Sequence, residues 1–408
     1  MPSSSISLFR NRFVRAVLVS NLFSQLGIWI RNLSVLLYVM HRTEGDALAV
    51  SMVSVAEYAP IFAFSFIGGA FADRWRPKAT ILCCESLSSL SVFLIFLWLE
   101  NGIWQAVFFA TLCSSVLSQF AQPPGMKLFK MHLRGDEATA CMSLLQTLFS
   151  IFMIAGPVIG TWIYRQLGIR PAILLTCVCF LLSAVSLLVM PADRREATDP
   201  EGTRGSLWVD LKDGLRYVAG HRNLLSLSLC FMIVGLGVGL ISPLSIFVVT
   251  ERLGLPAEAL SWIQIPYGLG ELAGGLVTFL VAAKIAPQRL LTIGLLANAA
   301  GIALTGLSSS LWLTMLAQLG IALLQPAIFI GNNALVMQQT ETAYIGRVTG
   351  IRTPLMTGAM LLAMSLVGVL KSVLTLEGIY VLAGGCFAAG LLILLPYRGT
   401  NRNAAGEA

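Results

Sequence analysis

The stretch QLGIWIRNLSVLLYVM, residues 25–40, is largely apolar but holds an arginine at position 31. It belongs to an apolar run over residues 14–40, and a helix needs only about 20 such residues to cross a bilayer. A charge at the bilayer centre costs about 2.5–3.5 kcal/mol, so it normally faces protein or a wet cavity. We therefore expect a transmembrane helix that turns Arg31 away from lipid.

The composition extends this expectation to the whole chain. Hydrophobic residues make up 56% of the 408 residues, charged residues only 12%, and the mean hydropathy is +0.80. Soluble domains carry about 25% charged residues, so a bilayer is the natural solvent here. The sequence predicts an all-α membrane protein with twelve transmembrane helices. The expected spans are 14–40, 48–71, 79–99, 104–124, 139–163, 171–190, 224–249, 257–283, 290–308, 311–333, 346–370 and 377–396.

The positive charge of the chain is explained by membrane topology and not by nucleic-acid binding. The formal net charge is +7, and 20 of the 27 Lys and Arg residues fall on the cytoplasmic side if the N-terminus is inside. Cytoplasmic loops collect these residues, which predicts a cell-membrane protein with both termini in the cytoplasm. The eight cysteines lack metal-ligand spacing and the three histidines are dispersed, so we expect no metal and no cofactor.

A long polar segment lies midway along the chain. Residues 191–223 separate an N-terminal six-helix half, 1–190, from a C-terminal six-helix half, 224–408. Two such halves are a common transporter plan, with the binding site between them near the midplane. Apolar residues at helical spacing after position 207 predict either an amphipathic helix on the cytoplasmic membrane surface or a helical linker.

The loop between the second and third spans carries a motif, GGAFADRWRPKATIL over residues 68–82. Its charges can be read as basic topology anchors alone. Their order also resembles the loop signature of the major facilitator superfamily, with departures at Arg76 and Pro77. The resemblance implies a gating loop that locks one conformation through charged contacts. The matching residues are Gly69, Asp73, Arg74 and Lys78.

A second motif, AGPVIG over residues 155–160, lies in the fifth span. Gly156 and Gly160 allow another helix to approach closely, and Pro157 permits a bend because it lacks a backbone N–H. The motif resembles the Gly-Pro signature of the superfamily's antiporters. This similarity favours an exporter over an importer.

The layout of the whole chain resembles the macrolide-efflux-like branch of the superfamily's drug:proton antiporters. The matching stretches are LGIWIRNL in the first span, DLKDGLRYVAGHRNL before the seventh and IGRVTGIR at the eleventh. Many relatives carry an acidic residue where this chain has Ile28. The chain has no Walker-type Gly-x-x-x-x-Gly-Lys motif and no hydrolase motif, so an ion gradient would have to supply the energy.

Charged residues inside the spans are the candidates for proton coupling. Arg31 and Glu57 each lie nine residues from the outer end of their spans, which places both about 13–14 Å deep. They form either a permanent ion pair or a pair that breaks when Glu57 takes a proton. Glu271 shares a face with Gln264 and Tyr267, and it is either a proton carrier or a protonated group between helices.

Two further charges lie closer to the span ends. Glu85 is six residues into its span, so we expect it to reach toward the cytoplasm or to pair with the basic loop. Arg352 is expected to contact a lipid headgroup or a loop. Neither is predicted to act on substrate.

Uncharged polar and aromatic residues complete the expected cavity, which the superfamily builds from spans one, four, seven and ten. Several of them share a helix face, and the aromatic ones would suit a bulky apolar or cationic ligand. The predicted lining residues are Gln25, Trp29, Asn32, Tyr58, Gln119, Gln122, Gln264, Tyr267, Gln318, Gln325 and Asn332.

These features predict a monomeric secondary transporter and not an enzyme. The expected activity is proton-coupled efflux of hydrophobic or cationic drugs such as macrolides, by alternating access within membrane lipid. Alternatives are export of a siderophore or metabolite, and lipid flipping by the same fold. A membrane sensor would need a soluble domain that no segment of this chain is large enough to provide.

Overall fold

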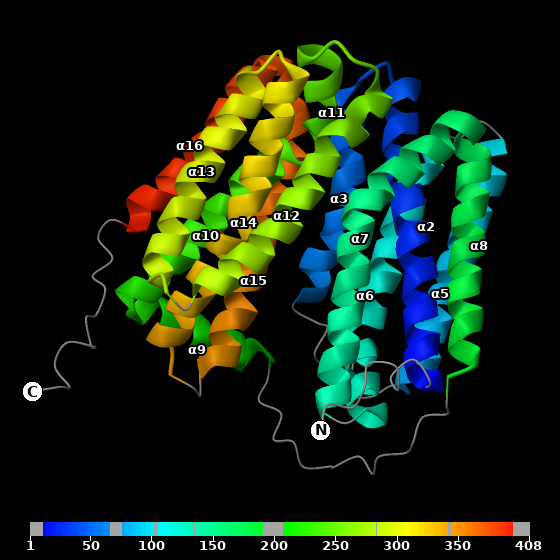
Figure 1. The fold of residues 1–408 in the computed structure, drawn as a ribbon, viewed down its shortest axis with the longest axis horizontal. Helices are drawn as coiled ribbons and strands as arrows, with labels where there is room; N and C mark the ends of the chain where they lie inside the picture. Colours follow the sequence, from blue (N-terminus) through cyan, green and yellow to red (C-terminus); the bar gives the residue numbers. More distant parts are fainter. Residues whose placement is uncertain are drawn as a thin grey trace, which may run out of the picture. The chain divides into compact units, whose positions relative to one another are not determined.

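The computed structural model describes residues 11–65, 76–100, 105–133, 135–190, 207–282, 284–341 and 344–394, and these ranges contain helices and no β-strand (Figure 1). The predicted all-α architecture is therefore confirmed. The N-terminal helices are α2 (Arg12–Arg42), α3 (Ala47–Ser65), α5 (Pro77–Glu100), α6 (Ala106–His132), α7 (Gly135–Leu167) and α8 (Ile169–Leu188). The later ones are α9 (Leu207–Gly220), α10 (Arg222–Ile241), α11 (Ser245–Phe247), α12 (Leu260–Ala282), α13 (Pro287–Leu307), α14 (Leu311–Gln339), α15 (Ile345–Val373) and α16 (Leu376–Leu394).

Each of the twelve predicted spans corresponds to one of these helices. Within the described residues, eleven helices are long and apolar enough to cross a membrane, and α6 contributes a shorter apolar stretch over Ala106–Ala121. The seventh span continues past α10 through α11 and a π-helical turn, Val248–Arg252.

Local sequence signals explain where several helices begin and end. The Asn11 side chain accepts a hydrogen bond from the Phe13 N–H at 2.9 Å, which caps the start of α2. Pro287 occupies the first turn of α13, where its missing N–H is not needed. Gly168 has a φ of +78° in the short turn between α7 and α8, a conformation that favours glycine.

The described residues form two compact units. The first contains α2, α3 and α5–α8, together with Pro243–Gly268 and Met364–Val369. Within it, α2 packs against α7 and α8, and α5 packs against α6 and α8. Its apolar cluster includes Phe13, whose ring lies edge-on to Phe129 at 5.8 Å between centroids.

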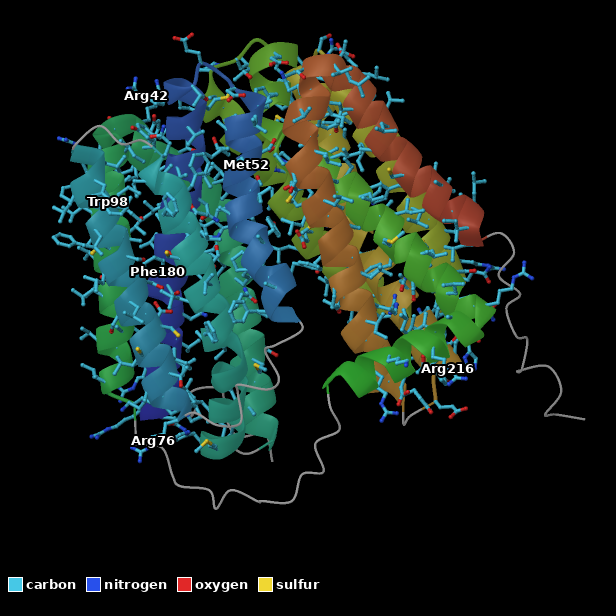
Figure 2. The ribbon with its side chains drawn as sticks, turned by 180° about the vertical axis from the view of Figure 1, so that it is seen from behind. Arg42, Met52, Arg76, Trp98, Phe180 and Arg216 are labelled. Carbon is cyan, nitrogen blue, oxygen red and sulfur yellow. The ribbon has the colours of Figure 1, made fainter. Side chains whose placement is uncertain are left out.

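Exposed side chains of the first unit fit a lipid-facing surface with polar ends. Trp98 is half exposed and points outward, as expected for a side chain that meets lipid (Figure 2). Arg42 and Arg76 lie at opposite ends of the helices in the same view. The apolar surface between them therefore follows the long axis of the helices.

The second unit contains α9, α10 and α16 with most of α12–α15. Here α13 packs against both α14 and α16, and α10 packs against α16. Helix backbones approach closely at α12 and α14, because a Cβ added at Gly274 would lie 2.1 Å from the Leu323 carbonyl oxygen. Gly270 meets the same helix, so the two glycines form a packing pair as their spacing indicates.

Helix α9 confirms that the second part of the central polar segment is helical. It lies against the start of α15, where the Tyr217 and Tyr344 rings stack at 4.2 Å. A Cβ at Gly214 would lie 3.0 Å from the Arg347 carbonyl oxygen, so any side chain at this position would crowd the contact. The two motifs DLKDGLRYVAGHRNL and IGRVTGIR thus pack against each other. Leu215 is exposed on α9.

Candidate functional site

Arg31 and Glu57 are joined through the amide of Asn32. The Arg31 guanidinium is buried, with 3% of the residue exposed, and its Nε and Nη2 donate to Asn32 Oδ1 at 3.0 and 2.9 Å. Asn32 Nδ2 in turn donates to Glu57 Oε1 at 2.7 Å. No direct ion pair within 4 Å joins these two described residues. The amide oxygen faces the cation and the amide N–H faces the carboxylate, so both charges have a complementary partner.

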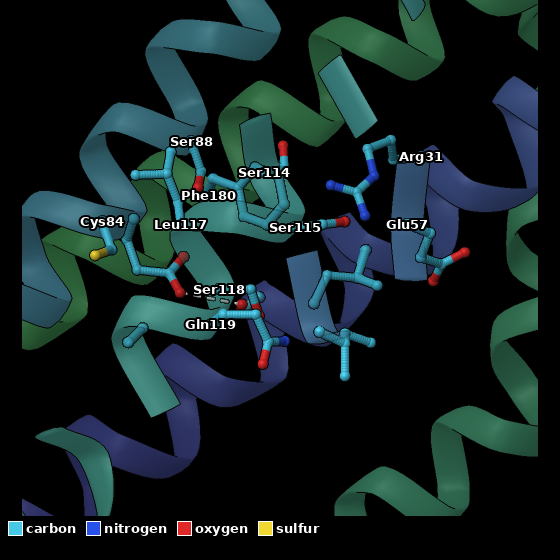
Figure 3. Close-up of a pocket in the computed structure, with 15 residues that line it drawn as sticks. Arg31, Glu57, Cys84, Ser88, Ser114, Ser115, Leu117, Ser118, Gln119 and Phe180 are labelled. Carbon is cyan, nitrogen blue, oxygen red and sulfur yellow. Dashed lines mark hydrogen bonds between the residues drawn. The ribbon is translucent and has the colours of Figure 1, made fainter. Parts of the chain in front are cut away.

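These two charges line a cavity of about 130 Å³ within the first unit (Figure 3). Residues of α2, α3, α5, α6 and α8 form its wall, and Figure 3 shows the serines of α6 between Arg31 and Cys84. One buried water molecule needs about 10–15 Å³ of such space, so the cavity has room for several water molecules. Its polar lining residues are Ser24, Arg31, Glu57, Glu85, Ser88, Ser114, Ser115, Ser118 and Gln119.

Glu85 is a member of this wall that the sequence interpretation missed. It does not simply reach toward the cytoplasm, because its Oε1 accepts a hydrogen bond from Ser24 Oγ of α2 at 3.2 Å. Its other oxygen, Oε2, is buried without a hydrogen-bond partner among the described residues. Glu85 and Ser88 are one helical turn apart, as are Ser114 and Ser118, and these two polar pairs are the signal that could have revealed the site.

The Gly-Pro motif of the fifth span packs against α2, the helix that carries Arg31. A Cβ at Gly156 would lie 2.4 Å from the Trp29 ring, and one at Gly160 would lie 2.9 Å from the Trp29 carbonyl oxygen. The predicted close helix approach is therefore made between α7 and α2. Trp29 packs on this glycine face, and Pro157 lies inside α7.

Replacing Gly156 with alanine is expected to destabilise the protein by about 1–3 kcal/mol, because the new methyl group overlaps the Trp29 ring. The thermal stability of the purified protein in detergent measures this loss. Since the overlapping atoms belong to a side chain, Trp29→Leu combined with Gly156→Ala should recover much of it. Equal stability of Gly156→Ala and wild type would contradict the observed packing.

A second buried arginine lies in the second unit. Arg352 is only 4% exposed, so the prediction of a headgroup or loop contact is wrong. Its Nη2 donates to Asn332 Oδ1, and its guanidinium carbon lies 5.2 Å from the centre of the Phe231 ring. Asn332 Nδ2 donates to the Leu227 carbonyl oxygen at 3.3 Å. Asn332 is fully buried, and its amide holds Arg352 against α10.

The other predicted site residues lie on the helices expected of them. Gln119 lines the same cavity as Glu57. Glu271 is partly exposed on α12 and has no hydrogen bond or ion pair with another described residue, whereas Gln264 Oε1 is buried without a partner in the described part of the chain. The remaining residues with described side chains are partly buried: Gln25, Tyr58, Tyr267, Gln318 and Gln325.

The gating loop falls mostly outside the described residues. Gly69, Asp73 and Arg74 belong to residues 66–75, and the Gln122 side chain is also outside the described part. Lys78 lies in the first turn of α5, and its Nζ donates to the Leu188 carbonyl oxygen at 3.3 Å and to that of Met190. A cation is favourable at this position because the carbonyls at a helix C-terminus carry partial negative charge.

Comparisons with known proteins agree with this architecture. The profile of the Major Facilitator Superfamily matches residues 17–227. The uncharacterized MFS-type transporter YkuC of Bacillus subtilis (strain 168) is 26% identical over 96% of this chain and 92% of its own length. The multidrug efflux pump Tap of Mycolicibacterium fortuitum is 27% identical over 57% of this chain and 58% of its own.

The likeness extends to solved structures. A mutant of the nucleoside transporter NupG superposes with a TM-score of 0.76, covering 95% of this chain and 100% of that one at 13% identity. At this identity the likeness shows the fold alone. The profile match over more than half of the chain shows the family. The chain therefore belongs to the Major Facilitator Superfamily, and it is a membrane transporter of that family.

Proposed function

We propose that this transporter is a proton-coupled exporter of hydrophobic or cationic drugs, in the manner of the macrolide-efflux-like branch. The observation that carries the proposal is the chain of hydrogen bonds from Arg31 through Asn32 to Glu57, at the wall of a polar cavity inside a membrane bundle. The partial similarity to the efflux pump Tap supports export.

Protonation of Glu57 would change this chain of contacts. The ionised carboxylate accepts from Asn32 Nδ2 and balances the charge of Arg31 nearby. A proton on Glu57 removes that negative charge and leaves the guanidinium with only the Asn32 amide oxygen as a neutral acceptor. In surroundings of low dielectric constant, an unbalanced charge is costly, so the proton favours rearrangement of α2 and α3.

The remaining parts follow the superfamily plan. Two halves, 1–190 and 224–408, would rock about the predicted lining residues, with the 69–78 loop locking one state. Glu271 would act as the second proton carrier in the C-terminal half. We place the protein in the cell membrane as a monomer with both termini in the cytoplasm, since its positive charges gather on that side.

Inverted membrane vesicles that hold a respiration-driven pH gradient test the coupling. The pH gradient quenches the fluorescence of an acridine dye. When macrolides or cationic dyes are added to vesicles with the wild-type protein, this fluorescence should recover, because antiport lets protons leave the vesicles. Glu57→Gln should reduce the response to background, since glutamine cannot exchange a proton. Glu44→Gln is the control, because Glu44 is an exposed carboxylate in the turn after α2. Normal drug-triggered proton release by Glu57→Gln would refute the role of Glu57.

A groove on the first unit favours lipid flipping as a second candidate. It lies between α3 and α6 with a volume of about 510 Å³, and its wall is almost entirely apolar. Met52 and Phe109 are among its lining residues, with Asp46 at the helix start. An acyl chain would suit such a wall. Transfer of headgroup-labelled lipid between the leaflets of proteoliposomes, without dequenching by any drug, would select this activity.

A further inference from the structure

Two oxygen atoms in the cavity of the first unit lack partners. Glu85 Oε2 and Ser114 Oγ are both buried and neither makes a hydrogen bond to the described residues. They come from different helices, α5 and α6, and both residues line the cavity that also holds Arg31 and Glu57. A buried polar atom without a partner is unfavourable, because it has given up its hydrogen bonds to water. Water molecules in the cavity can satisfy both atoms, and a proton on Glu85 would turn Oε2 into a hydrogen-bond donor.

The charges of the cavity do not balance when both acids are ionised. Arg31 contributes one positive charge, and Glu57 and Glu85 contribute two negative charges. The other titratable group in the wall is Cys84 of α5, while α6 and α8 contribute only serine, glutamine and apolar residues. One proton on either acid makes the cavity neutral, which a low-dielectric membrane interior favours.

We propose that Glu85 is a second proton-binding residue of the N-terminal bundle and shares one proton with Glu57 across this cavity. This inference rests on the proposed coupling role of Glu57. In the transfer, the O–H bond on Glu57 breaks and an O–H bond forms on Glu85 Oε2, with water in the cavity passing the proton. The sum of charges stays at zero, because one acid gains the negative charge that the other loses.

The serines around Glu85 suit such an exchange. Ser24 Oγ donates to Oε1 at 3.2 Å, and the hydroxyl of Ser183 on α8 also interacts with the carboxyl group. Oε2 makes no close hydrogen bond to the described residues and is available for a proton. Hydroxyl groups both donate and accept hydrogen bonds, so Ser88, Ser114 and Ser118 can orient water in either direction of transfer. A metal cation is less suitable, since the Arg31 guanidinium occupies the same cavity.

Infrared spectroscopy tests the proposal without any transported substrate. The purified protein, reconstituted in liposomes, is measured at neutral pH, where the carbonyl stretch of a protonated carboxyl is distinct from the bands of a carboxylate. Glu85→Gln should lose the signal of one protonated carboxyl, and so should Glu57→Gln. Either substitution leaves one acid opposite Arg31, and that acid then ionises.

Ser86→Ala is the matched control, because Ser86 is adjacent in sequence but exposed on the outer side of α5. Its spectrum should equal that of the wild type. Ser24→Ala keeps both acids and removes the donor to Oε1, so it should shift the carboxyl band even if Glu85→Gln does not fold. An intact signal in folded Glu85→Gln, or an unshifted band in Ser24→Ala, would overturn the proposal.

Two arms separate this inference from its alternatives. Replacing the choline chloride of the buffer with sodium chloride should leave the infrared band of the protonated carboxyl unchanged. Loss of this band in sodium chloride would assign the cavity to a metal cation instead. The vesicle assay reports drug coupling independently. If the infrared signals behave as expected while no drug releases the gradient, the proton site stands and the drug-export proposal fails.

Discussion

Gly274→Ala is expected to lower the free energy of unfolding by about 3 kcal/mol or more, a large share of the roughly 5–15 kcal/mol by which folded proteins are typically stable. A Cβ at this position lies 2.1 Å from the Leu323 carbonyl oxygen and 2.7 Å from the Leu323 Cα. Both atoms belong to the backbone of α14, so no side-chain rotation relieves the overlap. The midpoint of thermal unfolding in detergent, together with the yield of monodisperse protein, measures the effect.

The adjacent glycine provides the control. A Cβ at Gly275 meets no other described atom within 4 Å, so Gly275→Ala should be neutral or stabilising by up to about 1 kcal/mol, since alanine favours a helix. Both variants add the same methyl group to α12, at neighbouring positions. Comparable stability of the two would mean that α12 and α14 do not approach at Gly274.

Arg31→Met is expected to cost about 3–5 kcal/mol of stability, because it removes the cation and leaves Glu57 as an unbalanced acid in the bundle. The methionine side chain is similar in length to that of arginine and leaves little empty space, so the loss of stability reports the missing charge and not a change in volume. The Asn32 oxygen would also lose both of its donors. Thermal unfolding of the single variants and of Arg31→Met/Glu57→Gln completes a double-mutant cycle.

The double variant should be more stable than the sum of the two single losses predicts, by about 0.5–3 kcal/mol. Such a coupling means that the two charges support each other across Asn32. Strict additivity would show that the Asn32 amide insulates them. The Phe231–Arg352 contact lies in the second unit and should stay unaffected, so Phe231→Leu added to either background should give an additive change.

The apolar runs were sufficient to predict the helices and the membrane class. Hydropathy is a property of composition over about 20 residues, and the twelve expected spans each correspond to a helix. The depth of Arg31 and Glu57 followed from counting residues along straight helices, and the shared Asn32 contact is consistent with that count. The close helix contact at Gly156 followed from the spacing of small residues.

Side-chain direction could not be obtained in the same way. Counting gave the positions of Glu85 and Arg352 along their spans, but not the rotation of their helices. Glu85 turns toward Ser24 of α2, and Arg352 turns toward Asn332 of α14. The partner in each case belongs to a different helix, 61 residues away for Glu85 and 20 residues away for Arg352. A single sequence shows which residues are polar, but it does not show which helices bring them together.

The neutral residue between Arg31 and Glu57 also has an evolutionary consequence. An asparagine codon becomes an aspartate codon by one base change, so a chain with Asn32→Asp is a single step away. The arginine would then have a carboxylate within direct reach, and Glu57 would face a like charge where it now accepts a hydrogen bond. Such a descendant would need one more proton at this position to keep the same sum of charges. One nucleotide at codon 32 thus decides whether the neutral amide between the two charges is kept or a second carboxylate is placed beside Glu57.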